Sequence, residues 1–265
     1  MQIKDQLQRV IKLNRNPQRV VCLVPSITEL ICDLGLESLL VGVTKFCVHP
    51  QHIITNVVVV GGTKQVHYDK IRNLNPDIIL CNKEENTPEM IRELEAITTV
   101  HISDVNTIED CLELIDMYGV IFQCSPQAKS LISKISSAKI DFEDFIKTQP
   151  VREVTYFIWK DPWMVAANNT FINYMLSLNN FKNTFQKESR YPEIAMDNIY
   201  SNVELVLLSS EPYPFKNEHK KVIQPQFPNA KIFLVNGEMF SWYGSRLLLA
   251  FDYFKTWHRT VLPSE

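Results

Sequence analysis

Glycine is scarce in this sequence, with only seven among 265 residues. Loops that cradle phosphates need closely spaced glycines, and the one double glycine, Gly61–Gly62, lacks the lysine-serine pair of a P-loop. The motifs Gly-Xaa-Ser-Xaa-Gly, His-Glu-Xaa-Xaa-His and Gly-Xaa-Gly-Xaa-Xaa-Gly are also absent. Hydrolases, metalloproteases and nucleotide-dependent enzymes are therefore disfavoured, and an enzyme is the least favoured class of function.

Long apolar runs and clusters of basic residues are missing as well. No uninterrupted apolar run is long enough to span a bilayer, and residues 1–20 lack the apolar centre of a signal peptide. The formal charge is -3, so the clustered positive charge of a nucleic-acid-binding surface is not expected. As written, the chain is expected to carry no export signal, which keeps a cytoplasmic location open.

No two cysteines have the Cys-Xaa-Xaa-Cys spacing of zinc or thioredoxin-like sites. Five of the six lie in apolar stretches, and cysteine behaves as a small buried hydrophobe. We therefore expect six free thiols, a usage that is commoner in reducing compartments. The six are Cys22, Cys32, Cys47, Cys81, Cys111 and Cys124.

Short apolar runs do alternate with helical patterns along the chain. Residues 2–13 predict an edge strand or hairpin, and Ser26 with Glu29 predicts a capping box for a helix that Gly35 ends. In the first half, strands are predicted at 19–24, 39–43, 56–62, 77–82 and 98–103, and helices at 67–75, 88–96 and 107–123. In the second half, strands are predicted at 151–159, 163–167, 203–210 and 230–235. Helices there are predicted at 169–178, capped by Asn168 or Asn169, between the strands at 203–210 and 230–235, and at 242–257. Such alternation is typical of parallel sheets covered by helices.

Residues 126–148 form an unbroken helical pattern without glycine or internal proline. A helix of this length would extend about 34 Å and act as a rigid spine. It predicts an N-terminal lobe at 1–124, a connecting helix at 125–149 and a C-terminal lobe at 150–265. The two halves also match each other, with Asp77 opposite Glu204 and Glu84 opposite Glu211. A single doubly wound sheet is the alternative.

Several motifs occur in one order along nearly the whole chain, from residue 4 to 257. The first half contains PSITE at 25–29, GGT at 61–63 and LNPD at 74–77. The second half contains WKDPWMVA at 159–166, LLSSEPYPF at 207–215 and GEMFSWYGSR at 237–246. In these motifs the chain resembles the ABC-importer substrate-binding proteins for cobalamin, ferric siderophores and haem.

The resemblance implies an α/β fold of two lobes with parallel-rich central sheets, joined by one long spine helix, with the ligand in a cleft between the lobes. It further implies a monomer without an intrinsic cofactor, which binds cobalamin, haem or a ferric siderophore and delivers it to an ABC permease. The expected location is the periplasm or the membrane surface. A cytoplasmic ligand sensor that kept this fold after losing export is the alternative function.

In parallel α/β sheets, ligands bind beyond the carboxyl ends of the strands. Aromatic faces there suit corrin rings, catecholates or haem, and basic side chains could hold a carboxylate-rich chelate or form ordinary ion pairs. Cys47 and His49 could both face one metal or ligand, but two ligands do not complete a metal site. The predicted ligand contacts are Ser26, Lys45, Cys47, His49, Asn82, Trp159, Trp163, Trp242, Tyr243 and Arg246.

Four glutamates are candidates for contact with the permease. In the family that the chain resembles, one glutamate on each lobe meets arginines of the permease, and complementary charge fixes orientation and speeds encounter. We expect them to be exposed on one side of the molecule, although a solvated acidic loop is the alternative. They are Glu84, Glu85, Glu211 and Glu218.

Overall fold

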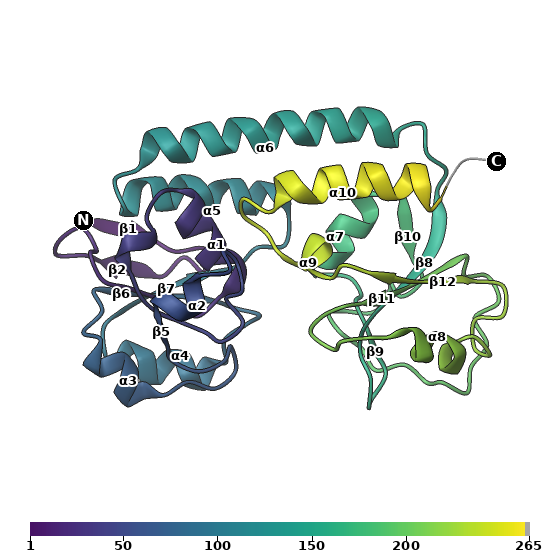
Figure 1. Cartoon of the computed structure of the whole chain (residues 1–265), viewed down its shortest axis with the longest axis horizontal. Coiled ribbons are helices and arrows are strands. Elements are labelled where there is room, and N and C mark those ends of the chain that lie inside the picture. Colours follow the sequence, from purple (N-terminus) through teal and green to yellow (C-terminus); the bar gives the residue numbers. More distant parts are fainter. Residues whose placement is uncertain (263–265) are drawn as a thin grey trace. The chain divides into compact units, whose positions relative to one another are not determined.

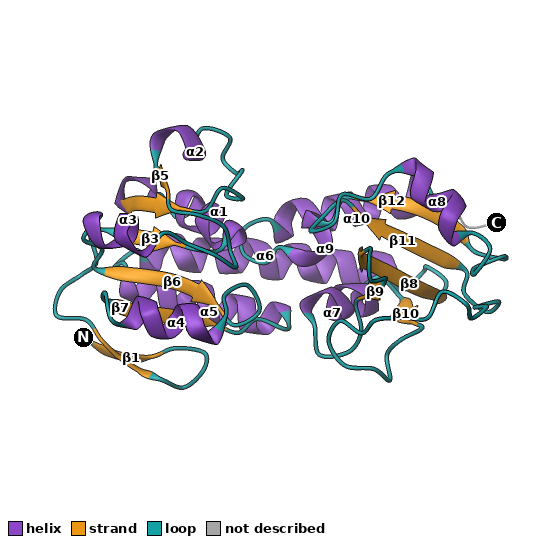
Figure 2. Cartoon of the chain, turned by 90° about the horizontal axis from the view of Figure 1, so that it is seen from below, coloured by secondary structure: helices purple, strands orange, loops and turns teal. Residues whose placement is uncertain are grey.

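The chain contains two β-sheets of mainly parallel strands, each in a compact unit of its own (Figure 2). The computed structural model describes residues 1–262. Unit 1 comprises Met1–Ser136 and Trp242–Leu247, and unit 2 comprises Ser137–Ser241 and the chain from Leu248 onward. The predicted α/β class with two parallel-rich sheets is thus confirmed. The segment 242–247, which the sequence assigns to the second half, belongs to the first unit.

The sheet of unit 1 has five parallel strands in the order β5-β4-β3-β6-β7. The strands are β3 (Val20–Cys22), β4 (Leu40–Val43), β5 (Val58–Val59), β6 (Ile78–Asn82) and β7 (Thr99–Ser103). The helices are α1 (Pro25–Asp33), α2 (Ile53–Asn56), α3 (Tyr68–Asn73), α4 (Pro88–Glu95) and α5 (Ile108–Ile121). Figure 1 shows α3 and α4 on one side of this sheet and α5 on the other. Buried side chains of β3 and β6 pack with those of α3 and α4.

The predicted N-terminal hairpin is confirmed as β1 (Gln2–Lys4) and β2 (Val10–Lys12), paired antiparallel. It lies along β7, where the Arg9 guanidinium donates to the carbonyl of Val100 at 2.6 Å. The Thr99 hydroxyl donates to the carbonyl of Lys12 at 3.3 Å. The hairpin therefore covers an edge of the sheet that would otherwise expose unpaired backbone groups.

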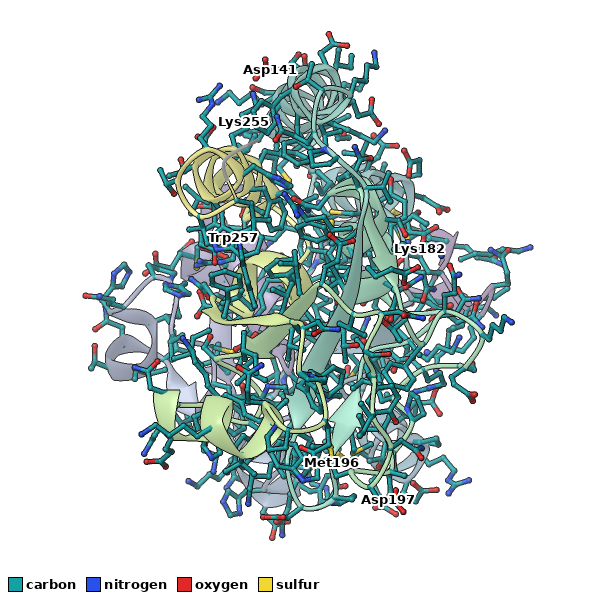
Figure 3. The ribbon with its side chains drawn as sticks, turned by 90° about the vertical axis from the view of Figure 1, so that its right-hand side faces the viewer. Asp141, Lys182, Met196, Asp197, Lys255 and Trp257 are labelled. Carbon is teal, nitrogen blue, oxygen red and sulfur yellow. The ribbon has the colours of Figure 1, made fainter. Side chains whose placement is uncertain are left out.

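The long helix is confirmed as α6 (Ser125–Ile146). At its start, a Cβ on Gly119 of α5 would come within 2.7 Å of the Ala128 Cβ, so α5 and α6 pack closely only because residue 119 is glycine. Its later part belongs to unit 2, where Phe142 packs on Phe251. Figure 3 shows Asp141 beside Lys255, with which it forms an ion pair.

The sheet of unit 2 has the parallel order β10-β8-β11-β12, with β9 antiparallel to β8. The strands are β8 (Arg152–Trp159), β9 (Met164–Val165), β10 (Phe181–Asn183), β11 (Leu205–Ser209) and β12 (Lys231–Val235). The helices are α7 (Phe171–Leu178), α8 (Asn217–Ile223), α9 (Glu238–Ser241) and α10 (Leu247–Thr260). The helix predicted between the strands at 203–210 and 230–235 is confirmed as α8, whereas β10 and α9 are not predicted from the sequence. In Figure 3, Trp257 of α10 lies over this sheet, where it contacts Phe181 and Phe233.

Two predicted helix starts are wrong. The first helix begins at Pro25, with Val24 as a cap that offers no side-chain hydrogen bond, because proline suits the first helical position. Helix α7 is capped by neither Asn168 nor Asn169 but by Thr170, whose hydroxyl accepts the Asn173 N–H at 3.1 Å. Gly35 does end α1, with a φ of 79°, as predicted.

The closing helix begins later than the predicted residue 242. Helix α10 starts at Leu247, and Gly244 adopts a φ of 97°, which a helix does not allow. The Gly244 N–H donates to the Cys111 sulfur at 3.1 Å. Contacts made by residues 242–246 with unit 1 thus replace the first turn of the predicted helix.

The predicted internal repeat is confirmed by topology. In unit 1 three neighbouring strands have the order β3-β6-β7, and in unit 2 the three equivalent strands have the order β8-β11-β12. Asp77 before β6 accepts the N–H groups of Gln18 and Arg19, at the start of β3. Glu204 before β11 accepts the N–H of Glu153, in β8. Each carboxylate therefore joins the amino ends of two equivalent strands.

Candidate functional site

The carboxyl ends of the strands in unit 1 bring several predicted residues to one edge of the sheet. Because all five strands are parallel, their following loops emerge together. Ser26 follows β3, the Lys45–His49 loop follows β4, and Asn82 ends β6. Both Ser26 and Asn82 are buried.

Asn82 organises the loop after β6. Its Oδ1 accepts the N–H groups of Glu84 at 2.8 Å and Glu85 at 3.2 Å, and its Nδ2 donates to the Ser103 hydroxyl at 3.0 Å. Its own N–H donates to Asn86 Oδ1 at 2.9 Å. The buried amide therefore sets the direction of both glutamates.

The Lys45–His49 loop turns its side chains in different directions. The Cys47 thiol is buried between the hydroxyls of Thr28, at 3.1 Å, and Thr44, at 3.3 Å, and burial raises the pKa of Cys47. Phe46 is exposed, and the Lys45 ammonium lies 5.0 Å from its ring centre. His49 is half-buried. Cys47 and His49 thus lie in different surroundings.

Residues 242–247 form a segment that docks on α1 and on the Lys45–His49 loop. The Arg246 guanidinium, only 5% exposed, makes two hydrogen bonds to Glu29, at 2.6 and 2.7 Å. It also lies 4.9 Å from the centre of the Trp242 ring, which meets His49 edge-on at 5.5 Å. Burial raises the pKa of Glu29, although Arg246 lowers it.

Tyr243 belongs to the same docked segment and reaches the ends of β3 and β7. Its hydroxyl lies 3.4 Å from the Ser103 hydroxyl and hydrogen-bonds with Ser26. Sequence reasoning missed Ser103, although a serine directly after the apolar run of β7 is the same signal that singled out Asn82 after β6.

Aromatic side chains gather at the carboxyl ends of β8 and β11 in unit 2. Trp159 is 39% exposed and meets Tyr213 edge-on at 5.7 Å. Trp163 is half-buried and stacks on Phe215, with the Lys160 ammonium 5.7 Å from the Trp163 ring centre. Tyr213 follows β11 in the same loop as Glu211.

The four predicted docking glutamates differ in their surroundings. Glu84 and Glu85 are half-buried after β6, and burial raises the pKa of Glu85. Glu211 is half-buried after β11 and accepts the Ser241 hydroxyl at 2.8 Å. Glu218 is exposed on α8. Glu84 and Glu211 thus occupy equivalent places in the two units.

Unit 2 also has a hollow at the opposite, amino ends of its strands. Arg152, Glu204 and Lys231 are among its lining residues. Arg152 and Glu204 form an ion pair across it at 3.4 Å. Few aromatic or hydroxyl groups line this hollow, and it contains none of the predicted ligand contacts.

All six cysteines are free, and five are buried; Cys32 is partly exposed. No three histidine, cysteine, aspartate or glutamate side chains within residues 1–262 are arranged so that they could hold a metal ion. None of the helices in that range combines the length and apolar character needed to cross a lipid bilayer.

Each unit has a sheet of mainly parallel strands with polar and aromatic groups at the carboxyl ends of the strands. This arrangement is typical of ligand-binding α/β proteins. Residues 20–226 match the family model described as periplasmic binding protein, so the chain belongs to the periplasmic binding protein family. This is a family of transport binding proteins, and the prediction that the chain is not an enzyme is confirmed.

Similarity to two sequence relatives supports the same family assignment. An uncharacterized ABC transporter substrate-binding lipoprotein of Bacillus subtilis is 26% identical over 189 residues, which cover 68% of this chain and 60% of that protein. A vitamin B12-binding protein of Pectobacterium atrosepticum is 23% identical over 250 residues, which cover 88% of this chain and 86% of that protein.

Solved structures share the fold. The periplasmic vitamin B12-binding protein BtuF of Vibrio cholerae matches with a TM-score of 0.80 and 17% identity, over 94% of this chain and 99% of that one. The periplasmic heme-binding protein RhuT of Roseiflexus matches with a TM-score of 0.79 and 17% identity, over 90% of this chain and 97% of that one.

Proposed function

We propose that this protein is the substrate-binding component of an ABC importer, and that its ligand is a metal chelate of the cobalamin, haem or ferric-siderophore class. Family membership and the printed functions of the relatives support this proposal. The observation that carries it is the pairing of aromatic rings with a few polar groups at the carboxyl ends of the strands in both units.

The proposed ligand contacts divide between two surfaces. On unit 1 they are Ser26, Lys45, His49 and the docked residues Trp242 and Tyr243. Lys45 and the Phe46 ring are exposed, whereas Ser26, Trp242 and Tyr243 are only 5–7% exposed and would meet a ligand with an edge. Cys47, Asn82 and Arg246 support this surface from behind, because their polar atoms already have partners within unit 1. On unit 2 they are Trp159 and Trp163, with Tyr213 beside them. Broad apolar rings with few polar groups suit a large planar or globular chelate.

We assign contact with the permease to Glu84, Glu211 and Glu218. Glu84 and Glu211 support this assignment by their equivalent places after β6 and β11, and Glu218 by its exposure. Charged groups at the rim of an interface mainly set orientation and association rate. The proposed place of action is the outer face of the cytoplasmic membrane, as in the periplasmic and lipoprotein relatives.

Six free thiols favour a second candidate function, a cytoplasmic sensor of the same class of ligand. Such a sensor would use the same strand-end contacts but would have no need of the three docking glutamates. Binding of the purified chain to its permease separates the two functions.

The ligand is tested by titrating the intrinsic tryptophan fluorescence with cyanocobalamin, haemin and ferric siderophores. We expect saturable quenching by one of these classes. Replacing Trp159 by alanine should weaken binding by about 2 kcal/mol, as for a buried aromatic contact. The matched control is Ile199→Ala, at an exposed apolar residue of the same unit. Absence of saturable binding to every chelate would overturn the proposed function.

A further inference from the structure

Glu85 of unit 1 has a carboxyl group that hydrogen-bonds with the Thr63 hydroxyl, from another loop. Its backbone N–H is held by Asn82 Oδ1 at 3.2 Å, in the loop that directly follows β6. Its side chain is half-buried, whereas Glu89, on the next helix, is exposed. Glu85 is thus held at its backbone, and its side chain is partly desolvated, at the edge of the sheet where a ligand would bind.

The surroundings of the Glu85 carboxyl come from four segments of unit 1. The Thr63 hydroxyl hydrogen-bonds with it, Lys64 attracts it and Glu84 repels it, but burial is the largest influence and raises its pKa. The Tyr243 hydroxyl and the Cys47 thiol are close enough for the Glu85 charge to act on them. Since Tyr243 reaches Ser26 and Ser103, the charge of Glu85 acts on a polar region that includes the hydroxyls at the ends of β3 and β7.

Most cations of this surface are already matched by acceptors, while the Lys45 ammonium lies over the Phe46 ring. Arg246 is bound twice by Glu29, and Lys83 pairs with Asp104 at 2.7 Å. The Lys64 ammonium donates to the carbonyl of Glu84. Among the residues that the structure describes, the surface around Glu85 therefore offers hydroxyls, a carboxyl group and the Lys45 ammonium, and one such cation does not balance a dianionic ligand.

A ligand that covers Glu85 removes the water that still solvates it. An amide N–H can replace that water with a charge-assisted hydrogen bond to the carboxylate. A ligand carboxylate would instead place two like charges together in a medium of low dielectric constant, and one of them would have to take up a proton. Corrinoids carry carboxamide side chains, whereas haem carries two propionates.

We propose that Glu85 is a specificity-determining residue that favours amide-bearing chelates, such as corrinoids, over carboxylate-bearing chelates, such as haem. This rests on the proposed function, and it assigns Glu85 to ligand recognition instead of permease docking. Binding of haem is then coupled to proton uptake, while binding of a corrinoid is not.

The test compares dissociation constants of dicyanocobinamide and haemin for the wild-type chain and for Glu85→Gln. Near pH 8 we expect the wild type to prefer the corrinoid, and the variant to narrow that preference about tenfold, which corresponds to roughly 1.4 kcal/mol. Between about pH 8 and pH 6, haemin affinity should rise more in the wild type than in the variant, because only the wild type can protonate residue 85.

The matched control is Glu89→Gln, at the exposed carboxylate on the following helix, which should leave both the preference and its pH dependence unchanged. Melting temperatures show whether each variant is folded. A wild type that binds neither compound overturns the proposed function and this assignment together. A wild type that binds, with a preference that Glu85→Gln does not alter, overturns the role of Glu85 alone. A wild type that prefers haemin near pH 8 likewise overturns the role of Glu85 alone.

Discussion

Among the buried histidines, one in each unit has a lowered pKa. His101 in β7 contacts the Met117 sulfur at 2.9 Å, and burial lowers its pKa from 6.5 to about 4. His258 in α10 pairs with Asn179 Oδ1 at 3.1 Å, and burial lowers its pKa from 6.5 to about 4 as well. Both rings therefore take up protons more readily in the unfolded chain than in the folded one.

The buried histidines predict acid sensitivity. A folded-state pKa below the unfolded value gives stability that is fully present above pH 6.5 and is lost as pH falls towards 4. Each ring contributes on the order of 3 kcal/mol to the loss across that range. Urea unfolding at a series of pH values should show this decline.

His101→Leu should reduce the slope of stability against pH, because a leucine cannot take up a proton. No group among residues 1–262 hydrogen-bonds with the His101 Nδ1, so the substitution leaves few partners unpaired. The control His52→Gln, at an exposed histidine, should keep the wild-type slope. An unchanged slope in His101→Leu would show that His101 does not titrate on unfolding.

The positions of single residues at strand ends were predicted more reliably than the hydrogen-bond partners of those residues. Residues after apolar strands, such as Asn82 and Trp159, could be identified because strand ends follow from the hydrophobic pattern. The partner of Arg246 could not, since Glu29 lies 217 positions away and local spacing says nothing of such a distance. For the same reason the sequence assigned Glu29 to a capping box.

Elements were predicted where the pattern was long or strongly apolar. Helix α6 has an uninterrupted helical pattern, and its prediction was correct to within two residues at each end. The three residues of β10 and the four residues of α9 are too few to show a periodic pattern. The start of α10 was wrong because tertiary contacts of the docked segment outweigh local helix propensity.

The docked segment 242–247 depends on the buried Arg246–Glu29 pair. Glu29→Ala leaves the Arg246 charge buried without its main partner, and we expect a loss of about 3 kcal/mol in the free energy of unfolding. Denaturant unfolding measures this loss. Glu37→Ala, which removes an exposed partner of His52, should cost less than about 1 kcal/mol.

The double variant Glu29→Ala, Arg246→Met provides the sharper comparison. Removing both charges leaves no unpaired ion, so the double variant should be more stable than Glu29→Ala alone. If the stability losses of the single variants Glu29→Ala and Arg246→Met simply add up to the loss of the double variant, the guanidinium is not held by Glu29 in solution. Because Arg246 also lies over Trp242, Glu29→Ala should weaken ligand binding along with stability.

At the scale of the whole molecule, the chain repeats one α/β arrangement. Asp77 and Glu204 begin equivalent strands, and Glu84 and Glu211 follow the same strands seven residues later. The repeat was visible in the sequence because each copy needs an acidic residue before its buried strand and a polar loop after it. The identity of the ligand was not visible, since the proposed contacts on each unit come from several separate loops.

The equivalent glutamates predict a separation of transport from ligand binding. Reversing Glu84 and Glu211 to lysine should impair ligand uptake through the permease and change ligand affinity less than about twofold, because rim charges act on encounter and orientation. Reconstituted transport measures the first effect and fluorescence titration the second. Glu143→Lys, on α6, is a control charge reversal that should leave uptake unchanged. Normal uptake by the double reversal would exclude both residues from docking.

The central claim, that the carboxyl ends of the strands bind a metal chelate, is tested most directly by hydrogen exchange with and without cyanocobalamin. The account predicts that ligand protects the loops at 44–49 and 82–86 in unit 1 and at 159–163 and 211–215 in unit 2. Exchange at the amino ends, around residues 148–152 and 201–204, should stay the same. Protection confined to those amino ends, beside the hollow lined by Arg152 and Lys231, would contradict the claim.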